Sequence, residues 1–286
     1  MGLVAAFVSA FLHTAKDLVS KSLAADVDSI VSTFASFAFA LPFYILLLAI
    51  LLWTGHEELV FSSSFLSLVL LRAIFDCGAE WCKMQALSEA DISLLSPFLA
   101  LSPVFLLILS PLITGDVPSF RGGAGVVLVI LGGLFLLSPS SMRGGSISKR
   151  AIVLATLTSV LFAINACFDR LAVQEATPVW AGFMMTLTAG AFFVPSLLRN
   201  AARQSDLQMY SFAFSLRGIF ELGYMVCKLY ALQFMQAPYV DSIRKLSIVT
   251  SVLGGKIVFN EQNFLQRLFG STLILLGIIL IVLSQL

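Results

Sequence analysis

Two stretches of this chain repeat each other: LRAIFDCGAEWCKMQAL at residues 71–87 and LRGIFELGYMVCKLYAL at residues 216–232. At an offset of 145 residues, nine of their 17 positions are identical, and Asp76 is matched by Glu221. The same offset, without a gap, pairs Asp116 with Glu261, Gly125 with Gly270, and Gly132 with Gly277. Chance would give roughly one or two identities in such a window. The chain therefore contains an internal duplication, and the fold has to be read as two related halves.

The composition is that of a membrane protein. The 286 residues are 59% hydrophobic and 12% charged, with a mean hydropathy of +0.98, whereas soluble domains carry about 25% charged residues. A water-soluble globule could not cover so much apolar surface, and a disordered chain would be far more polar. The net charge of +1 leaves no basic surface for nucleic acid. We therefore expect a polytopic membrane protein.

Turns and charges divide the chain into apolar segments of a length that can span a bilayer, which takes about 20 residues. There are ten of them, at 3–24, 29–53, 65–87, 91–113, 121–138, 151–172, 178–198, 209–234, 237–258 and 265–285. The segment SPSSMRGGSISKR at 138–150 has the composition of a linker. We expect a first five-helix repeat at 1–140, a linker at 141–150 and a second five-helix repeat at 151–286.

Five is an odd number of spans, so the second repeat enters the membrane from the opposite face. The predicted fold is an all-α integral membrane protein with ten transmembrane helices in two inverted five-helix repeats. This architecture recurs in secondary transporters, where the substrate site lies near the midplane between the repeats.

Loop charges predict an orientation. The loops after the first, third, fifth, seventh and ninth spans share one side and contain Arg143, Lys149, Arg150, Arg199, Arg203 and Arg267. The other side has Arg121 and, at a span end, Arg170. The positive-inside rule then favours both termini outside the cell.

Charged residues recur along one face of the third and eighth spans. In the third span they are spaced by 4, 4 and 3 residues: Arg72, Asp76, Glu80 and Lys83. The eighth span repeats the stripe, with Met225 in place of the second acid: Arg217, Glu221 and Lys228. Such spacing favours ion pairs along a helix. We expect structural or gating charge pairs here, with Lys83 and Lys228 close enough to span ends to snorkel.

The remaining intramembrane charges are the candidates for substrate binding. A charge at the bilayer centre costs about 2.5–3.5 kcal/mol, so it must face a wet cavity or another charge. The predicted substrate-binding residues are Arg244, Lys245, Asp241, Glu80, Lys16 and His13. Asp17, the charged residues of the third and eighth spans and the candidates other than His13 form a set of deep charges with seven cations and five anions. This balance favours a ligand with a carboxylate or phosphate, and Glu80 and Asp241 could carry a proton for coupling.

Helix breakers lie at matching places in the two repeats. The fourth span contains Pro97, Pro103 and Pro111, and the ninth begins at Pro238. Interior prolines kink helices, and interrupted helices in corresponding positions point to transport sites. We expect hinges at Pro97, Pro103 and Pro238.

Small residues recur at seven-residue spacing in the fifth and tenth spans, as Gly125 and Gly132, and as Gly270 and Gly277. Such a face allows close helix packing. The contact is expected either within a repeat or between two copies of the chain, so a monomer and a homodimer stay open.

An enzyme is not expected, because the chain shows no cluster of His, Cys and carboxylates near a nucleophile. For the same reason we expect no cofactor and no metal. The expected partners are a small-molecule substrate and membrane lipid. A lipid flippase and a channel stay as alternatives to a metabolite carrier.

The ninth span carries a resemblance to a known family. Residues 237–261 read APYVDSIRKLSIVTSVLGGKIVFNE. This is similar to the ninth-span pattern of the EamA-type members of the drug/metabolite transporter superfamily, in which A-x-x-A-L-R-E-x-S leads to a closing Gly-Glu. Arg244 and Ser247 match, whereas Lys245 stands where many members have Glu.

The resemblance covers the whole chain and implies carrier-type transport of small polar metabolites by alternating access. Amino acids are frequent cargo of bacterial members. Sugar-phosphate and nucleotide-sugar relatives hold anions with basic residues on the ninth span, which Lys245 beside Arg244 resembles. We predict a multi-pass transporter of the cell (inner) membrane that exports an amino acid or other carboxylate, with a phosphorylated-metabolite antiporter as the alternative. Ten-span relatives usually keep both termini in the cytoplasm, opposite to the loop count.

Overall fold

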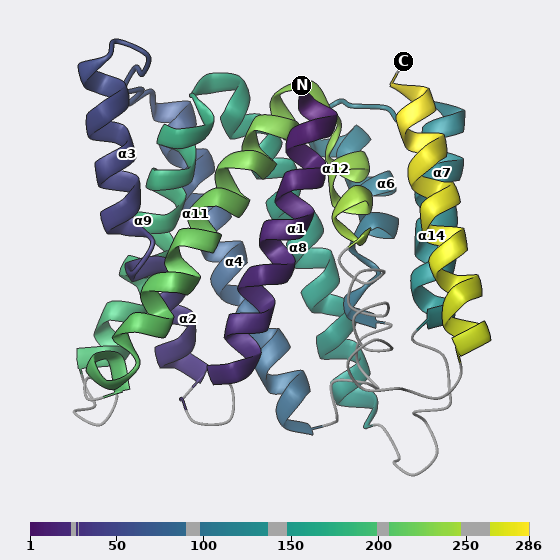
Figure 1. Ribbon diagram of the computed structural model, residues 1–286, viewed down its shortest axis with the longest axis horizontal. Helices are drawn as coiled ribbons and strands as arrows, with labels where there is room; N and C mark the ends of the chain where they lie inside the picture. Colours follow the sequence, from purple (N-terminus) through teal and green to yellow (C-terminus); the bar gives the residue numbers. More distant parts are fainter. Residues whose placement is uncertain are drawn as a thin grey trace. The chain divides into compact units, whose positions relative to one another are not determined.

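The computed structural model describes residues 1–23, 27, 29–89, 98–136, 148–198, 206–246 and 264–285. Within these ranges every regular element is an α-helix (Figure 1). The all-α membrane fold predicted from the sequence is confirmed. Contacts divide the chain into two compact units, each of which takes helices from both repeats.

Unit 1 comprises Met1–Cys77 and Phe168–Phe234. Its helices are α1 (Gly2–Leu23), α2 (Ser29–Ala38), α3 (Leu41–Trp53), α9 (Pro178–Leu198) and α11 (Ser211–Phe234), with parts of α4 (Ser63–Glu89) and α8 (Lys149–Glu175). Helix α1 packs along α11, and α9 packs against α2 and α3 (Figure 1). The long α1–α11 contact brings a helix of the first repeat against one of the second.

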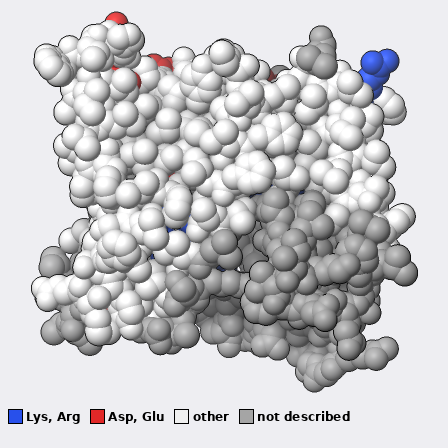
Figure 2. Space-filling model, viewed as in Figure 1, with Lys and Arg blue, Asp and Glu red and all other residues white. Residues whose placement is uncertain are grey.

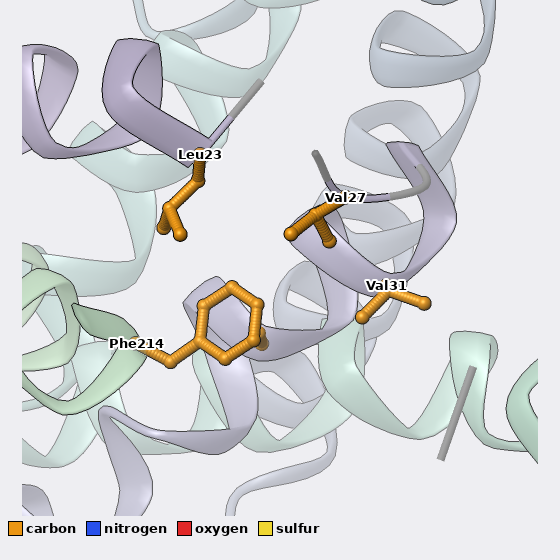
Figure 3. Close-up of a cluster of buried hydrophobic side chains, with 5 residues drawn as sticks. Leu23, Val27, Val31 and Phe214 are labelled. Carbon is orange, nitrogen blue, oxygen red and sulfur yellow. The ribbon is translucent and has the colours of Figure 1, made fainter. Parts of the chain in front are cut away.

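A buried apolar cluster brings together the end of α1, Val27, helix α2 and helix α11. Its members are Leu23, Val27, Val31, Ala35 and Phe214. Figure 3 shows Leu23, Val27, Val31 and Phe214 directed toward a common point. Because Phe214 belongs to α11 and is fully buried, the cluster packs the end of α1 and helix α2 against α11.

The second expected span is broken into two helices. Helix α2 ends at Ala38 and α3 begins at Leu41, with Pro42 as its second residue. A proline ring clashes with the carbonyl four residues before it, and that residue is Ala38. The span predicted at 29–53 is therefore one membrane-length segment, Ile30–Trp53, made of two helices.

Unit 2 comprises Gly78–Cys167 and Met235–Leu286. Its helices are α6 (Ser102–Ile113), α7 (Phe120–Leu136), α12 (Ala237–Arg244) and α14 (Phe264–Ser284), with the remaining parts of α4 and α8. Helix α12 packs against α6 and α7. Helices α7 and α14 lie side by side, teal and yellow in Figure 1.

The glycines of α7 and α14 face each other. A Cβ on Gly125 would lie 2.7 Å from the carbonyl oxygen of Gly277, and one on Gly132 would lie 2.6 Å from that of Gly270. The 145-residue offset exchanges these two contacts, because Gly125 corresponds to Gly270 and Gly132 to Gly277. The pair is therefore antiparallel with two-fold character. Packing within one repeat was expected as one alternative; the contact instead joins one repeat to the other.

Each of the ten expected spans contains at least part of a described helix. Three described helical segments are by length and composition able to cross a membrane: Ile30–Trp53, Lys149–Glu175 and Pro178–Pro195. Shorter apolar helices lie at Gly2–Lys16, Ser102–Ile113, Phe120–Phe135 and Phe269–Ser284. On the face that Figure 2 shows, the described atoms belong almost wholly to uncharged residues. Such a surface suits lipid contact.

Candidate functional site

A charged cluster lies at the end of α12 in unit 2. We call Ser102, Asp241, Arg244 and Lys245 the α12 cluster. Residues 237–243 are buried, and Lys245 is the residue that follows the last turn. The Tyr239 hydroxyl accepts a hydrogen bond of 2.8 Å from the backbone N–H of Ser119, just before α7. This bond ties α12 to α7 and so helps to fix the position of the cluster.

The four side chains of the α12 cluster contact one another through Asp241. Arg244 donates from Nη2 to Oδ1 of Asp241, one turn earlier on the helix. Ser102, the first residue of α6, donates to Oδ2 of the same carboxylate at 2.7 Å. Lys245 Nζ lies 3.9 Å from that Oδ2 and donates to the Ser102 hydroxyl at 3.3 Å. The side chains of Arg244, Lys245 and Asp241 are 19%, 15% and 7% exposed.

The α12 cluster offers both signs of charge to a ligand. An ammonium and a guanidinium donate well to carboxylate and phosphate oxygens, and a carboxylate accepts from a cationic group. Three of the six predicted substrate-binding residues, Asp241, Arg244 and Lys245, thus lie together. Spacing placed Asp241 one turn before Lys245 and predicted that it could neutralise only one of the two cations, whereas the structure brings it to both. Ser102 enters from another helix and was not among the predicted site residues.

Glu80 lies in a different contact of unit 2. It forms an ion pair with Lys83, one turn later on α4, with 2.9 Å between Oε2 and Nζ. The two side chains are 23% and 33% exposed, and Lys83 Nζ lies 5.9 Å from the centre of the Phe162 ring. The Glu80–Lys83 ion pair agrees with their three-residue spacing along one helix face. A substrate role for Glu80 stays a prediction.

A second charged network lies in unit 1 around Asp169 of α8. Its fully buried carboxylate accepts a hydrogen bond from Arg72 Nε at 3.2 Å and one from Lys228 Nζ at 2.5 Å. Arg72 also donates to Asp76 at 2.9 Å, which is the pair that the four-residue spacing predicts. Asp169 therefore joins the two repeated stripes, α4 and α11, through one side chain.

The other predicted residues of unit 1 gather at α1 and α11. Lys16 Nζ lies 2.8 Å from Oε2 of Glu221. Arg217 donates to the backbone carbonyl and the hydroxyl of Ser32 at 2.9 and 2.8 Å. The Tyr224 ring contacts Lys16 and Lys228 at 4.8 and 6.0 Å and His13 edge-on at 4.8 Å. Spacing predicted an acid–base pair along α11, and the structure shows that α1 supplies a cation to its acid.

Asp169 is the residue that sequence reasoning missed. Its span was expected to end at residue 172, with the neighbouring Arg170 counted at the span end, but α8 continues to Glu175. Arg170 donates to the carbonyl of Leu232 near the end of α11. The missed signal was an acid inside an apolar run. The expectation that Lys228 snorkels to a span end was wrong, because its side chain is 12% exposed and binds Asp169.

The predicted hinges begin helices. Pro103 and Pro238 are the second residues of α6 and α12, where no helical hydrogen bond is lost. The helical residues 98–99 are separated from α6 by a turn at residues 100–101, so the fourth span is interrupted just before Pro103, and Pro111 is the proline inside α6. A hinge role for Pro103 and Pro238 stays a prediction. Pro97 lies outside the described residues, and so does Ser247; of Asp17 only the backbone is described.

Metal ligands do not gather in the part of the chain that the structure describes: no group of three or more His, Cys, Asp or Glu side chains could hold an ion there. The four cysteines are free thiols.

The EamA-like transporter family matches the chain over residues 1–138 and 149–283. An uncharacterized transporter of Archaeoglobus fulgidus is 27% identical over 197 residues, which span 65% of this chain and 66% of that relative. A solved crystal structure is similar with a TM-score of 0.74 over 99% of this chain and 98% of the other, at 15% identity, which is a likeness of fold. The family match covers both halves of a helical, apolar chain, so the protein is an integral membrane transporter and belongs to the EamA-like transporter family.

Proposed function

We propose that this protein is a secondary transporter that moves a small polar metabolite bearing a carboxylate, such as an amino acid, by alternating access. Export across the cell (inner) membrane is the proposed direction. The observation that carries the proposal is the α12 cluster, in which Arg244 and Lys245 share the carboxylate of Asp241 inside an apolar chain.

Burying a charge among apolar helices is unfavourable unless it contacts an opposite charge or a polar ligand. Arg244 and Lys245 can receive an anionic group, and Asp241 can receive a cationic one. A metabolite that carries a carboxylate beside an ammonium or hydroxyl matches this set. The same two cations also suit a phosphorylated metabolite, which is the second candidate.

A vesicle experiment tests the role of the α12 cluster. The full chain is reconstituted in proteoliposomes, and uptake is measured with amino acids, mono- and dicarboxylates, sugar phosphates and nucleotide sugars, after a thermal-shift screen of the same panel in detergent. A ligand at 100 times its Kd stabilises the protein by about 2.7 kcal/mol. The double variant Arg244→Gln/Lys245→Gln should remove uptake of the active compounds. Lys149→Gln, an exposed cation at the start of α8, is the matched control and should transport normally.

The outcomes separate the candidates. Uptake of carboxylates that is lost in the double variant supports the leading proposal, and uptake confined to phosphorylated compounds supports the second. Undiminished uptake by a folded double variant contradicts both. Absence of any uptake, with movement of a fluorescent lipid between leaflets, would identify a flippase. An imposed pH gradient in the same vesicles tests coupling through Glu80 and Asp241.

A further inference from the structure

We infer that Lys245 is the residue that contacts the anionic group of the substrate, whereas Arg244 is a positioning residue held by Asp241. This inference rests on the proposed function and assigns different roles to two adjacent cations. It also limits the kind of anion recognition that the α12 cluster can perform.

Arg244 is held within its own helix. Its Nη2 donates to Oδ1 of Asp241, which lies three residues earlier. An arginine–carboxylate contact of this kind is charge-assisted and orients the guanidinium as well as the acid. Arg244 therefore keeps Asp241 in place at the end of α12.

Lys245 is held loosely by comparison. An ammonium has three donors, yet among the described residues Nζ has one hydrogen bond of 3.3 Å to Ser102 and lies 3.9 Å from Asp241. The single hydroxyl hydrogen of Ser102 is already donated to Asp241 at 2.7 Å, so Ser102 can only accept from Lys245. Lys245 is thus oriented by weak contacts that an incoming anion can replace or join.

Burial distinguishes Lys245 from an ordinary basic residue at a helix end. A cation there stabilises the helix dipole in any protein, but it normally extends toward water. The Lys245 side chain is only 15% exposed and turns to α6 instead. An anionic ligand would give this ammonium the strong hydrogen bonds that Ser102 and Asp241 do not supply.

An ammonium and a guanidinium recognise anions differently. Arginine presents a planar fork that matches a carboxylate, whereas lysine acts as a compact point charge. If Lys245 contacts the anionic group, recognition depends on the charge of that group and little on its shape. A sulfonate should then replace a carboxylate on the same skeleton with little loss, and a neutral amide should not.

The test uses two matched sets of probes on the full-length protein in detergent: β-alanine, taurine and β-alaninamide, and propionate, ethanesulfonate and propionamide. Kd values come from thermal shift and calorimetry. In the native chain the carboxylate and sulfonate should bind with similar Kd, and the amide should bind about tenfold more weakly or worse, as expected for loss of a charge-assisted hydrogen bond.

Three variants separate the roles. Lys245→Gln should bring the three probes of each set to one weak Kd while the protein stays folded. Lys245→Arg should keep the preference for charge and should favour the carboxylate over the sulfonate. Arg244→Gln should lower the melting temperature but keep the ratio of the charged-probe Kd to the amide-probe Kd. If Lys245 had a merely structural role, Lys245→Gln would leave this ratio unchanged as well.

Failure of this inference can be told from failure of the proposed function. If Arg244→Gln equalises the probes and Lys245→Gln does not, the roles are reversed and this inference is overturned, while the α12 cluster remains the site. If the native protein binds the charged and the amide probes with equal Kd, or if neither variant changes the ratio, the α12 cluster is not the anion site and the proposed function loses the observation that carries it.

Discussion

Asp169 joins three helices of unit 1 through ion pairs. It belongs to α8, and its two partners, Arg72 and Lys228, belong to α4 and α11. Taking a carboxylate fully out of water is costly, and two cations within hydrogen-bonding distance offset that cost. In a membrane helix such an acid must have partners within the protein, since lipid offers none. We therefore regard Asp169 as the residue that organises the charges of unit 1.

Replacing Asp169 with Asn should destabilise the protein strongly. The change removes a buried counter-ion from both Lys228 and Arg72, and breaking a buried pair costs about 3–5 kcal/mol. The loss of unfolding free energy is measured by titrating the purified protein in detergent with SDS. Glu175→Gln, an exposed acid near the end of the same helix, should have little effect.

A double-mutant cycle tests whether the loss comes from the pair. Asp169→Asn/Lys228→Met should be less destabilised than the sum of its single variants, because the second change removes the uncompensated charge. Additive losses would mean that the two residues do not stabilise each other, and the network around Asp169 would have to be abandoned.

At the scale of elements, α7 and α14 pack through backbone contact at their glycines. A Cβ at Gly132 would lie 2.6 Å from the Gly270 carbonyl oxygen and 2.8 Å from the backbone nitrogen of Ile274. Backbone atoms cannot rotate away as a flexible side chain can. The adjacent Gly133 differs, because a Cβ there meets no atom within 4 Å. The two glycines form a matched pair for testing the packing.

Gly132→Ala should lower stability, and Gly133→Ala should preserve or raise it. Overpacking against a fixed neighbour typically costs about 1–3 kcal/mol, whereas replacing an unconstrained helical glycine with alanine gains about 0.5–1 kcal/mol. Melting temperatures of the two variants in the same detergent give the comparison. Equal shifts, or a larger loss at Gly133, would contradict the close α7–α14 contact.

At the scale of the whole molecule, an even number of spans places both termini on one side of the membrane. The loop charges favour the outside. Paired reporters fused to the N- and C-terminus should therefore both report the external side in intact cells.

Topology reporters give distinct answers. Reporters on opposite sides would contradict the ten-span, inverted arrangement. Reporters that are both cytoplasmic would contradict the loop count alone and would agree with the orientation usual among the ten-span relatives. The second result would leave the fold and the α12 cluster unchanged.

The sequence by itself determined the fold class and the charged helix faces. The fold class follows from properties of the sequence alone: the length of the apolar segments, the 145-residue duplication and the odd number of spans per repeat. Helical spacing brings Arg72 to Asp76 and Arg244 to Asp241 whatever the rest of the molecule does. The break at Pro42 was not predicted, although the proline stands in the sequence and acts on the carbonyl four residues before it.

Only the tertiary structure decided which helices share these charges. Three contacts join residues that are 59 to 205 positions apart in the sequence: Lys228 with Asp169, Lys16 with Glu221, and Ser102 with Asp241. Periodicity fixes the face of a helix on which a side chain lies but not the neighbour that covers it. The same reason explains why the glycines of α7 were expected within a repeat or between copies, yet meet those of α14 across the two repeats.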